Sequence, residues 1–414
     1  MPADAPAAID PDARATMAAM RPGAPDLGRM RAERRRRLAE SLRADGLDGL
    51  VLVGPSNQEY AGVARPVAEA MRMHYDPVVV LVAADGDPPH VFTGAREGVP
   101  PEVPAERVHA PLAIEFPEGV EALGRAVQEC LPGARRVGID ELTGPLLAGL
   151  AAQLGRVELC DGAPALARAR LRKTRDEVEC IRRAQWINEM AMQDVERSLR
   201  PGVRQNELSA LFLRRAFELG ATASIIDPVW NLTPRSIAAG TQTANGDVGF
   251  PLASDDRFLR EGDLVLSDTG LTWNGYHSDF GKTWICGVDP RPDPELRACY
   301  ERWREVLAAV LAKIRPGASC GDLVRAAAGV EKKHALAHFY LGHGLGCDSS
   351  ESPYIGSDLG LAFDDEVPLV AGMVFVLEPV VWRDGVGGYR SEEIVHVTDD
   401  GHEMLTRYGW SPFE

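Results

Sequence analysis

The stretch DLVLSDTGLTWNGYHSDFGKTW, residues 263–284, contains the strongest structural pattern in this chain. Its Asn274-Gly275 dipeptide separates two runs of alternating apolar and polar residues, which is typical of a two-residue β-hairpin turn. Such a turn pairs Trp273 with Tyr276 and sets the register of both strands outward from it. The sequence therefore predicts an antiparallel hairpin here.

Two acids share one face of this predicted hairpin. The register places Asp279 opposite Gly270, and Asp268 lies two positions along the strand from Gly270. Because side chains two positions apart point to the same face, Asp268 and Asp279 are expected to be diagonal neighbours. Two carboxylates held together on an otherwise apolar hairpin repel each other unless a cation lies between them. The alternative is two unrelated acids near a turn.

Three further segments place metal-binding residue types in apolar or open surroundings. His343 lies in LGHGLG, where no bulky side chain blocks the approach of a ligand. Glu378 lies in the apolar strand MVFVLEPVV, where an uncompensated charge is costly. The next strand, YRSEEIVHV, contains both Glu392 and Glu393. Strand alternation alone would group Glu393 with the valines that follow it, so the pattern leaves the choice between the two open.

Four carboxylates and one imidazole in such surroundings indicate a metal site. The four negative charges would balance two divalent cations. Oxygen ligands with a single imidazole favour manganese, iron, cobalt or zinc over softer metals. Two such ions close together can activate a water molecule and polarise a substrate oxygen. We therefore expect two divalent metal ions in the C-terminal half of the chain.

Composition and charge narrow the class of protein. The chain has 414 residues, of which 45% are hydrophobic and 26% charged, with a formal net charge of −16. An acidic surface repels phosphate backbones, so nucleic acid is not an expected partner. No apolar stretch has the length of a signal peptide core or a membrane span, which predicts a cytoplasmic protein without membrane contact. Seven scattered cysteines without a CxxC pair fit a reducing compartment and argue against paired-thiolate zinc sites.

The length predicts more than one domain. Residues 1–25 are expected to form an N-terminal tail and residues 26–165 a smaller α/β domain. Residues 166–414 are expected to form an α+β domain, because helices and hairpins intermix there without regular βαβ alternation. The predicted helices are 27–45, 119–131, 144–154, 174–202, 206–220, 295–317 and 320–336, the predicted N-terminal strands are 49–54, 77–86 and 137–140, and 160–175 is interpreted as a connector.

The order of the motifs resembles that of a known family. One aspartate lies eleven positions after another, followed by GHGLG, then Glu-Pro, then Arg-x-Glu. This order resembles the pita-bread metallopeptidases, which include methionine aminopeptidase, prolidase, aminopeptidase P and creatinase-like proteins. The resemblance covers nearly the whole chain. It implies a creatinase/prolidase-like domain over 26–165, a pita-bread catalytic domain over 166–414, and a homodimer.

The resemblance also implies roles for individual residues. By this resemblance the metal ligands are Asp268, Asp279, His343, Glu378 and Glu392. The family's Arg-x-Glu-Asp pattern maps onto residues 390–393 and selects Glu392 over Glu393. Glu378 matches the carboxylate that also acts as general base on the bridging water. Apart from the resemblance, Arg390 is expected either to orient one of the metal-binding carboxylates or to be a surface arginine.

The chain departs from the family pattern at two positions. Family peptidases carry a histidine seven residues after the metal-binding histidine, and another about seventeen residues before the first metal-binding aspartate. The first position is Ser350 here, and the second falls near Pro251 with no histidine nearby. Metal-dependent dimethylsulfoniopropionate lyases of this fold also lack those histidines and use an aspartate shortly after the metal histidine as base. Asp348 is the nearest candidate for that base, or a simple turn residue.

Three further residues are candidates for the substrate pocket. His277 shares the Asp279 face of the predicted hairpin, so it is expected either to contact the site or to pack structurally. Trp230 and Tyr354 either line the pocket or belong to the core.

Three functions stay open on this basis. The first is a metal-dependent hydrolase of the Xaa-Pro peptidase type that acts on a short peptide or small amide. The second is a metal-dependent lyase or non-peptide hydrolase of a small charged metabolite, including a creatinase-like activity. The third is a non-catalytic binding scaffold, which a fully retained set of buried acids argues against.

Overall fold

The computed structural model describes residues 23–63, 78–224, 228–233, 235–236, 256–287, 293–331 and 340–409. The chain divides after Asp176 into an N-terminal unit, which begins at Pro25, and a C-terminal unit, which begins at Glu177. The tail expected over 1–25 lies outside the described residues up to position 22. Each unit is described separately below.

The N-terminal unit is built on one mixed sheet of six strands in the order β4-β3-β2-β1-β5-β6. Its pairs β1–β2 and β2–β3 are antiparallel, whereas β1–β5, β5–β6 and β3–β4 are parallel. The central strands are runs of valine and leucine with nearly every residue buried, as expected of strands covered on both faces. The strands are β1 Gly49–Leu52, β2 Val79–Ala83, β3 His90–Phe92, β4 Val108–His109, β5 Arg136–Ile139 and β6 Glu158–Asp161.

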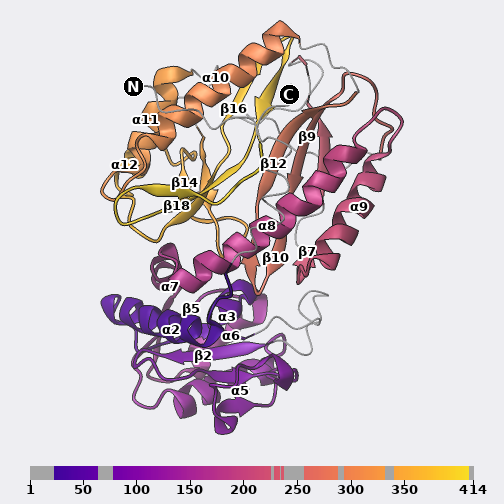
Figure 1. The fold of residues 1–414 in the computed structure, drawn as a ribbon. Helices are drawn as coiled ribbons and strands as arrows, with labels where there is room; N and C mark the ends of the chain where they lie inside the picture. The colour runs from indigo at the N-terminus through magenta and orange to yellow at the C-terminus, as the bar shows by residue number, and fades with distance from the viewer. Residues whose placement is uncertain are drawn as a thin grey trace. The chain divides into compact units, whose positions relative to one another are not determined.

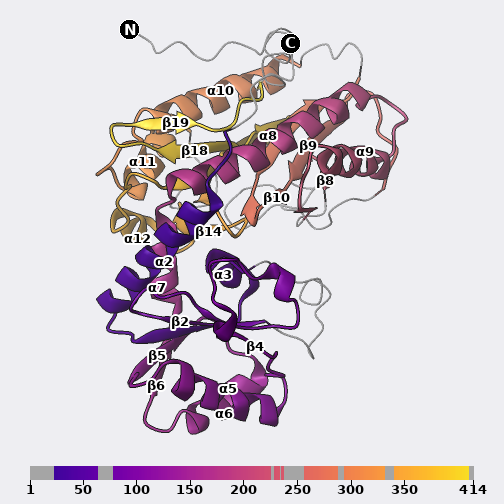
Figure 2. The same ribbon diagram turned by 60° about the horizontal axis from the view of Figure 1, so that its bottom comes forward.

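Helices cover both faces of this sheet. Figure 2, with elements labelled as in Figure 1, shows α5 and α6 on one face and α2 and α7 on the other. Predicted helices over 27–45, 119–131 and 144–154 correspond to α2, α5 and α6, and are confirmed. The helices of this unit are α2 Leu27–Ala44, α3 Pro55–Tyr60, α5 Pro117–Cys130, α6 Gly144–Gln153 and α7 Ala163–Leu171, with two short 3-10 turns at Arg96–Gly98 and Ala105–Arg107.

The interpretation of residues 160–175 as a connector is wrong, because most of this segment has regular secondary structure. It contains the end of β6 and the whole of α7. The carbonyl oxygen of Ala165 accepts a hydrogen bond from Ser41 Oγ at 2.7 Å, and that of Ala169 accepts one from Tyr60 Oη at 3.0 Å. This helix was not predicted because arginines interspersed among its alanines interrupt the short apolar stripe that packs it onto the rest of the N-terminal unit. The chain therefore divides later than residue 165.

The C-terminal unit mixes long helices with small antiparallel sheets, which confirms the predicted α+β class. Its sheets have the strand orders β12-β9-β8, β11-β10-β7, β14-β13-β15-β18-β19 and β16-β17. The helices are α8 Arg175–Ser198, α9 Gln205–Glu218, α10 Pro294–Leu311, α11 Cys320–Val330 and α12 Leu361–Asp365. The strands are β7 Ala223–Ser224, β8 Val229–Leu232, β9 Leu264–Thr269, β10 Leu271–Trp273, β11 Tyr276–His277, β12 Phe280–Ile285, β13 Gly342–Gly344, β14 Glu351–Ile355, β15 Val374–Leu377, β16 Val380–Arg383, β17 Gly387–Arg390, β18 Glu393–Val397 and β19 His402–Met404.

The hairpin predicted from Asn274-Gly275 is present in the predicted register. Trp273 pairs with Tyr276 next to the turn, and further out Asp268 pairs with Gly281. Asn274 and Gly275 have φ of 50° and 76°. Positive φ at both central residues is the conformation that a type I′ turn requires and that an Asn-Gly sequence favours.

Two helix layers support the strands of this unit. Helices α8 and α9 lie beside β8–β12 (Figure 1), and residues of both helices and of β8, β9, β10 and β12 share one buried cluster around Trp230, Phe212 and Phe280. Helix α10 packs on β16 and β17, where the rings of Trp303 and Tyr389 meet edge to face at 4.9 Å. None of the helices in the described part of the chain has the length and hydropathy that a bilayer crossing requires.

Candidate metal centre

The five residues predicted to bind metal come from separate strands and converge at one place. Asp268 lies in β9, and Asp279 directly precedes β12. Glu392 directly precedes β18, and ligand atoms of these three acids lie within 4.8 Å of one another. His343 in β13 joins them, with Nε2 at 3.6 Å from Asp279 Oδ2 and at 3.3 Å from an oxygen of Glu378.

Backbone hydrogen bonds hold the acidic residues in these places. The backbone N–H of Glu378 donates to Leu341 O at 2.8 Å, which ties the end of β15 to the start of the GHGLG segment. The backbone N–H of Glu392 donates to Gly281 O at 2.9 Å. The backbone positions of these two glutamates are therefore set by hydrogen bonds to segments far apart in sequence.

Glycines leave the space that the site needs. A Cβ atom on Gly281 would lie 2.4 Å from the carboxyl carbon of Glu392, closer than real Cβ contacts allow. Gly281 is also the strand partner of Asp268, so it leaves room for one acid beside another. In GHGLG, a Cβ on Gly344 would lie 2.2 Å from the backbone oxygen of Ser352 in the neighbouring strand β14.

Of the two adjacent glutamates, Glu392 is the one whose carboxylate lies in the acid cluster. Glu393 starts β18, and its Oε1 accepts a hydrogen bond from Ser391 Oγ at 3.0 Å. Alternation along the strand sends the two side chains to opposite faces.

The Arg390 guanidinium lies among the carboxylates. Its Nη1 is 3.2 Å from Asp268 Oδ2, and its Nη2 makes ion pairs with both Glu378 and Glu392. The backbone of Arg390 is fixed on both sides by Thr283, whose hydroxyl donates to Arg390 O at 2.9 Å and accepts from its N–H at 3.0 Å. Arg390 can therefore orient several of the acids, as the sequence suggested.

The carboxylates differ in their proton affinity. Burial, and after it the charge of Asp268, raises the pKa of Asp279 to about 7. Burial likewise raises the pKa of Asp268 and that of Glu392, although Arg390 opposes both shifts. Glu378 is the exception: burial would raise its pKa, but Arg390 and His343 together lower it to about 2. The positive charge near the other three acids does not compensate for their burial, whereas Glu378 has two cationic partners that do.

His343 responds to the same surroundings. Burial opposes its protonation, but the hydrogen bond to Glu378 and the charges of Asp279 and Glu378 outweigh that effect and raise its pKa to about 9. Without metal, a proton on His343 supplies part of the positive charge that these acids require.

These residues fit divalent cations. Four carboxylates face one guanidinium, so negative charge remains after Arg390 is counted. Glu392 Oε2 is buried and has no hydrogen-bond partner within the described part of the chain. An orphaned buried carboxylate oxygen is costly unless a cation or another donor satisfies it. Carboxylate oxygens with one imidazole are ligands suited to manganese, iron, cobalt or zinc.

Tyr340 belongs to the site and was missed at the level of sequence. Its Oη donates a hydrogen bond to Glu378 Oε1 at 2.9 Å. Burial and the neighbouring Glu378 raise its phenol pKa above the usual range, so it stays a donor at neutral pH. The only sequence signal was its place three residues before His343, on the same strand-forming segment.

Two residues that were predicted either to line the pocket or to belong to the core lie in different surroundings. Trp230 is a core residue of β8, fully buried, whose indole Nε1 donates to Ser209 Oγ at 2.7 Å. Tyr354 is the cross-strand partner of His343 and is 40% exposed, so it can line an approach to the site. Its Oη donates to the backbone oxygen of the exposed Ser350 at 3.3 Å.

Two other candidates lie outside the compact acid cluster. Asp348 is half-buried in the loop between β13 and β14 and is not one of the three clustered acids. His277 is buried in β11, and its backbone N–H donates to Gly346 O at 2.9 Å, which ties the hairpin to the GHGLG segment. The position near Pro251 lies outside the described residues.

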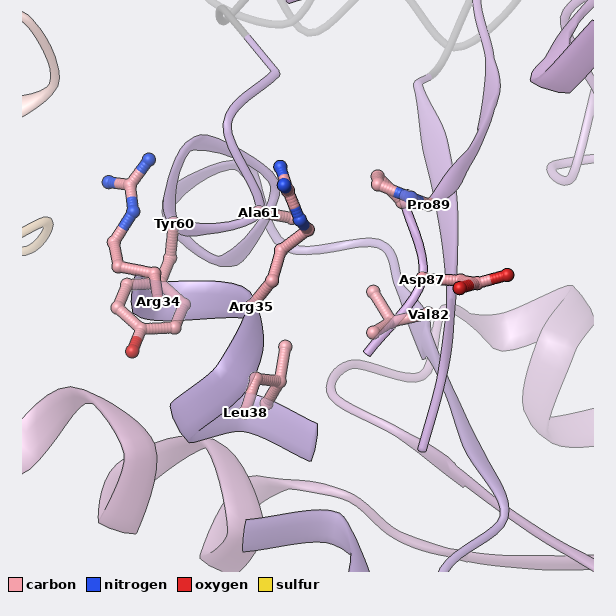
Figure 3. Close-up of a pocket in the computed structure, with 8 residues that line it drawn as sticks. All are labelled: Arg34, Arg35, Leu38, Tyr60, Ala61, Val82, Asp87 and Pro89. Atoms are coloured by element: carbon pink, nitrogen blue, oxygen red, sulfur yellow. The ribbon is translucent and has the colours of Figure 1, made fainter. Parts of the chain in front are cut away.

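A small pocket lies in the N-terminal unit (Figure 3). Arg35 and Leu38 of α2, Val82 of β2 and Asp87 are among its lining residues. Two other lining residues form a cation–π arrangement, in which the Arg34 guanidinium lies 5.3 Å from the centre of the Tyr60 ring. None of the predicted site residues lines this pocket, and we assign no function to it.

Comparison with protein families supports the interpretation of the metal centre. The model of metallopeptidase family M24 matches residues 179–399, more than half of the chain and the segment that contains all five predicted ligands. This chain belongs to metallopeptidase family M24. The model of the Creatinase/Prolidase N-terminal domain matches residues 34–172. The pita-bread fold expected from the motif order is thereby confirmed, as is a family that uses divalent metal.

Individual relatives of this M24 protein are similar at modest identity. A Xaa-Pro dipeptidase from Pyrococcus furiosus is 30% identical over 241 residues, which cover 58% of this chain and 64% of the relative. A probable dipeptidase PepE from Mycobacterium tuberculosis is 31% identical over 242 residues, which cover 57% and 58%. The matched part thus spans less than two thirds of the length of these relatives.

Solved structures show the same fold over nearly the whole M24 chain. A prolidase from Thermococcus sibiricus superposes with a TM-score of 0.74 at 22% identity, covering 94% of this chain and 99% of that one. A prolidase from Pyrococcus horikoshii superposes with a TM-score of 0.71 at 20% identity, covering 92% and 99%. At this identity the likeness concerns the fold.

Proposed function

We propose that this chain is a metal-dependent hydrolase of the Xaa-Pro peptidase type, acting on a short peptide or small amide. The observation that carries the proposal is the convergence of Asp268, Asp279, His343, Glu378 and Glu392. The dipeptidase names of relatives at about 30% identity support the same substrate class.

We assign Asp268, Asp279, His343, Glu378 and Glu392 as ligands of two divalent ions, of manganese, iron, cobalt or zinc. Such ions, when bound, lower the pKa of a coordinated water and polarise the carbonyl of the scissile amide. The unsatisfied Glu392 Oε2 and the raised pKa of Asp279 support this ligand set.

The residues of the chain have separate tasks in this proposal. Glu378 Oε1 accepts the proton of the attacking water, and Arg390 holds Glu378 Oε2 so that Oε1 faces the site. Tyr340 Oη, which donates to Glu378, is placed to donate instead to an oxygen of the substrate. Tyr354, exposed beside His343, lines the approach of the substrate.

The test begins with metal analysis. The purified chain is stripped of metal, reconstituted separately with Mn²⁺, Fe²⁺, Co²⁺ and Zn²⁺, and assayed with Ala-Pro and Gly-Pro dipeptides. We expect hydrolysis that depends on metal and is lost in Asp268→Ala. Failure of every reconstituted form to bind metal would contradict the proposal and favour a binding scaffold.

A second function has one specific observation in its favour. Ser350 occupies the position of an outer histidine found in family peptidases, and its exposed side chain cannot act as an imidazole donor. A metal-dependent lyase or non-peptide hydrolase of a small charged metabolite would not need that histidine, and Asp348 would then serve as its base. Dimethylsulfoniopropionate and creatine-like compounds, assayed beside the dipeptides, distinguish the two functions. Dipeptide hydrolysis that Asp268→Ala abolishes would rule out the lyase.

The resemblance further leads us to expect a homodimer in the cytoplasm. Light scattering of the metal-loaded chain tests the assembly state directly.

A further inference from the structure

A second group of metal-binding residue types lies in the N-terminal unit. His90 begins β3, His109 ends β4, and Cys130 is the last residue of α5. One ligand atom from each of the three lies within 4.8 Å of the other two. None of them is near the five residues of the M24 site in sequence, and the proposed hydrolase activity does not use them.

The sheet register explains why the two histidines meet. Strands β3 and β4 run parallel, with Phe92 paired to His109. His90 lies two residues before Phe92 and therefore points to the same face. The ring of His109 stacks on Phe92, with centroids 4.6 Å apart, and on His90, with centroids 5.3 Å apart.

Helix α5 brings the sulfur to this face. Phe92 belongs to a buried cluster that also contains Leu123 and Val127 of α5, and Cys130 packs against the same cluster. Figure 2 shows α5 beside the edge of the sheet where β4 lies. Core packing thus fixes the three side chains relative to one another.

The spacing suits a tetrahedral ion. His90 Nδ1 and His109 Nε2 are 3.0 Å apart. Metal–nitrogen bonds of about 2.05 Å and a metal–sulfur bond of about 2.3 Å at tetrahedral angles need separations of roughly 3.3 Å between the nitrogens and roughly 3.6 Å from sulfur to nitrogen. The two nitrogens are thus within a few tenths of an ångström of the required separation, and the sulfur lies no more than 4.8 Å from a nitrogen of each ring. All three side chains are half-buried, so water can occupy a fourth position.

The protonation states of the three side chains and the charges near them are compatible with metal binding. Burial lowers the pKa of His90 and that of His109, so both imidazoles are neutral at neutral pH and offer lone pairs. Burial raises the pKa of the Cys130 thiol, which would lose its proton to a bound metal. The nearby Arg107 guanidinium is paired with Asp87 at 2.8 Å, which offsets its repulsion of a cation.

We propose that His90, His109 and Cys130 form a Zn²⁺ site in the N-terminal unit, separate from the carboxylate centre. Two imidazoles and a thiolate select borderline ions such as Zn²⁺ over Mn²⁺ or Mg²⁺, which prefer oxygen. A hydrogen bond between the two imidazoles accounts for the 3.0 Å contact but not for a sulfur beside both rings.

The test uses sulfur ligation, which the carboxylate centre lacks. The full chain is stripped of metal under reducing conditions and titrated with Co²⁺ while its near-ultraviolet absorbance is recorded. We expect a thiolate-to-cobalt charge-transfer band that saturates with Co²⁺ and disappears when Zn²⁺ is added. A wild-type chain that shows no such band would overturn the proposal.

Matched cysteine variants assign the band. Cys130→Ser should lose it, whereas Cys160→Ser should keep it, because Cys160 is another half-buried cysteine of the same unit, in β6. Retention of the band in Cys130→Ser would overturn the proposal, because the sulfur would then come from elsewhere. Cys130→Ser should also keep the Mn²⁺-dependent hydrolysis of the wild type.

A histidine variant provides a second test in case the cysteine variant does not fold. If far-ultraviolet circular dichroism shows that Cys130→Ser is unfolded, His90→Gln decides the matter. Loss of a direct ligand should weaken Co²⁺ binding by at least the roughly 10–100-fold that loss of an outer partner costs. Unchanged Co²⁺ affinity in folded His90→Gln would contradict the site.

Discussion

At the scale of single residues, Gly281 matters because of the side chain it lacks. Gly281→Ala would place a methyl group where the carboxylate of Glu392 lies and displace that carboxylate from Asp268. We expect metal affinity to fall by more than about tenfold. Equilibrium dialysis with Mn²⁺, followed by metal analysis, measures the change.

The matched control is Gly329→Ala in α11. A Cβ at that position meets nothing within 4 Å, and helix interiors favour alanine over glycine. Its metal affinity should equal that of the wild type. If Gly281→Ala also binds like the wild type, Glu392 is not a ligand.

Tyr340 offers a test of the catalytic assignment. Tyr340→Phe removes only the hydroxyl that reaches Glu378, so the ligand set stays whole. We expect kcat to fall by about 10²-fold, as when one donor to a developing oxyanion is lost, while metal content is unchanged. Steady-state kinetics on the reconstituted variant measure this. An unaltered kcat would show that the phenol has no part in the chemistry.

Metal affinity should depend on pH through His343 and Asp279. Their pKa values in the metal-free chain are about 9 and about 7, and both groups must be deprotonated to bind a cation. With respect to these two groups, affinity should be constant above pH 9. It should fall about tenfold per pH unit between 9 and 7, where one proton is released, and more steeply below 7.

Calorimetric titration with Mn²⁺ in buffers of different ionisation enthalpy counts the released protons. A metal affinity that stays constant between pH 7 and pH 9 would mean that metal binding does not displace a proton from His343.

At the scale of elements, the hairpin of β10 and β11 depends on its turn. Gly275 has a φ of 76°, a conformation that costs an L-residue with a side chain about 1–2 kcal/mol. Gly275→Ala should therefore lower the free energy of unfolding by about that amount, measured by urea denaturation. Gly329→Ala serves again as the control, since it makes the same change without a positive φ and should not destabilise the chain.

Helix α8 connects this hairpin to the metal centre through hydrogen bonds. Asn188 of α8 donates hydrogen bonds to Thr269 O and to Ser278 Oγ, both at 2.9 Å, and Gln185 accepts one from the backbone N–H of Asp279 at 3.2 Å. Helix α8 therefore positions the residues on either side of the hairpin, where Asp268 and Asp279 lie. The acids are placed by an element about eighty residues away, which no local pattern indicates.

At the scale of the whole molecule, the two units should respond differently to a hard cation. Mn²⁺ prefers oxygen ligands, so it should bind the carboxylate centre of the C-terminal unit and not a thiolate. We expect saturating Mn²⁺ to slow amide hydrogen exchange in β9, β12 and β15, and to leave β1 and β2 unchanged. Exchange measured by mass spectrometry resolves these strands. Equal protection of both units would contradict a site confined to one of them.

Much of this arrangement follows from local sequence. Asn274-Gly275 determined the turn and the strand register, because positive φ at two successive residues strongly favours such a dipeptide. Apolar runs and periodic helices determined the α/β and α+β classes, because strands and helices bury faces at fixed periods. The order of acids and glycines around His343 determined the family.

Tertiary structure decided the rest. Strand periodicity left Glu392 and Glu393 open and only the family pattern selected Glu392, whose carboxylate joins the acid cluster because β12 approaches the start of β18. The part of Tyr340 depends on a contact with Glu378 from a different segment of the chain. The meeting of His90, His109 and Cys130 likewise needs a parallel strand pair covered by α5. Such contacts join residues distant in sequence through packing and backbone pairing, which composition and periodicity do not encode. The two aspartates flanking the hairpin were predicted as neighbours from sequence, but the buried oxygen of Glu392 that calls for a cation beside them is visible only in the folded chain.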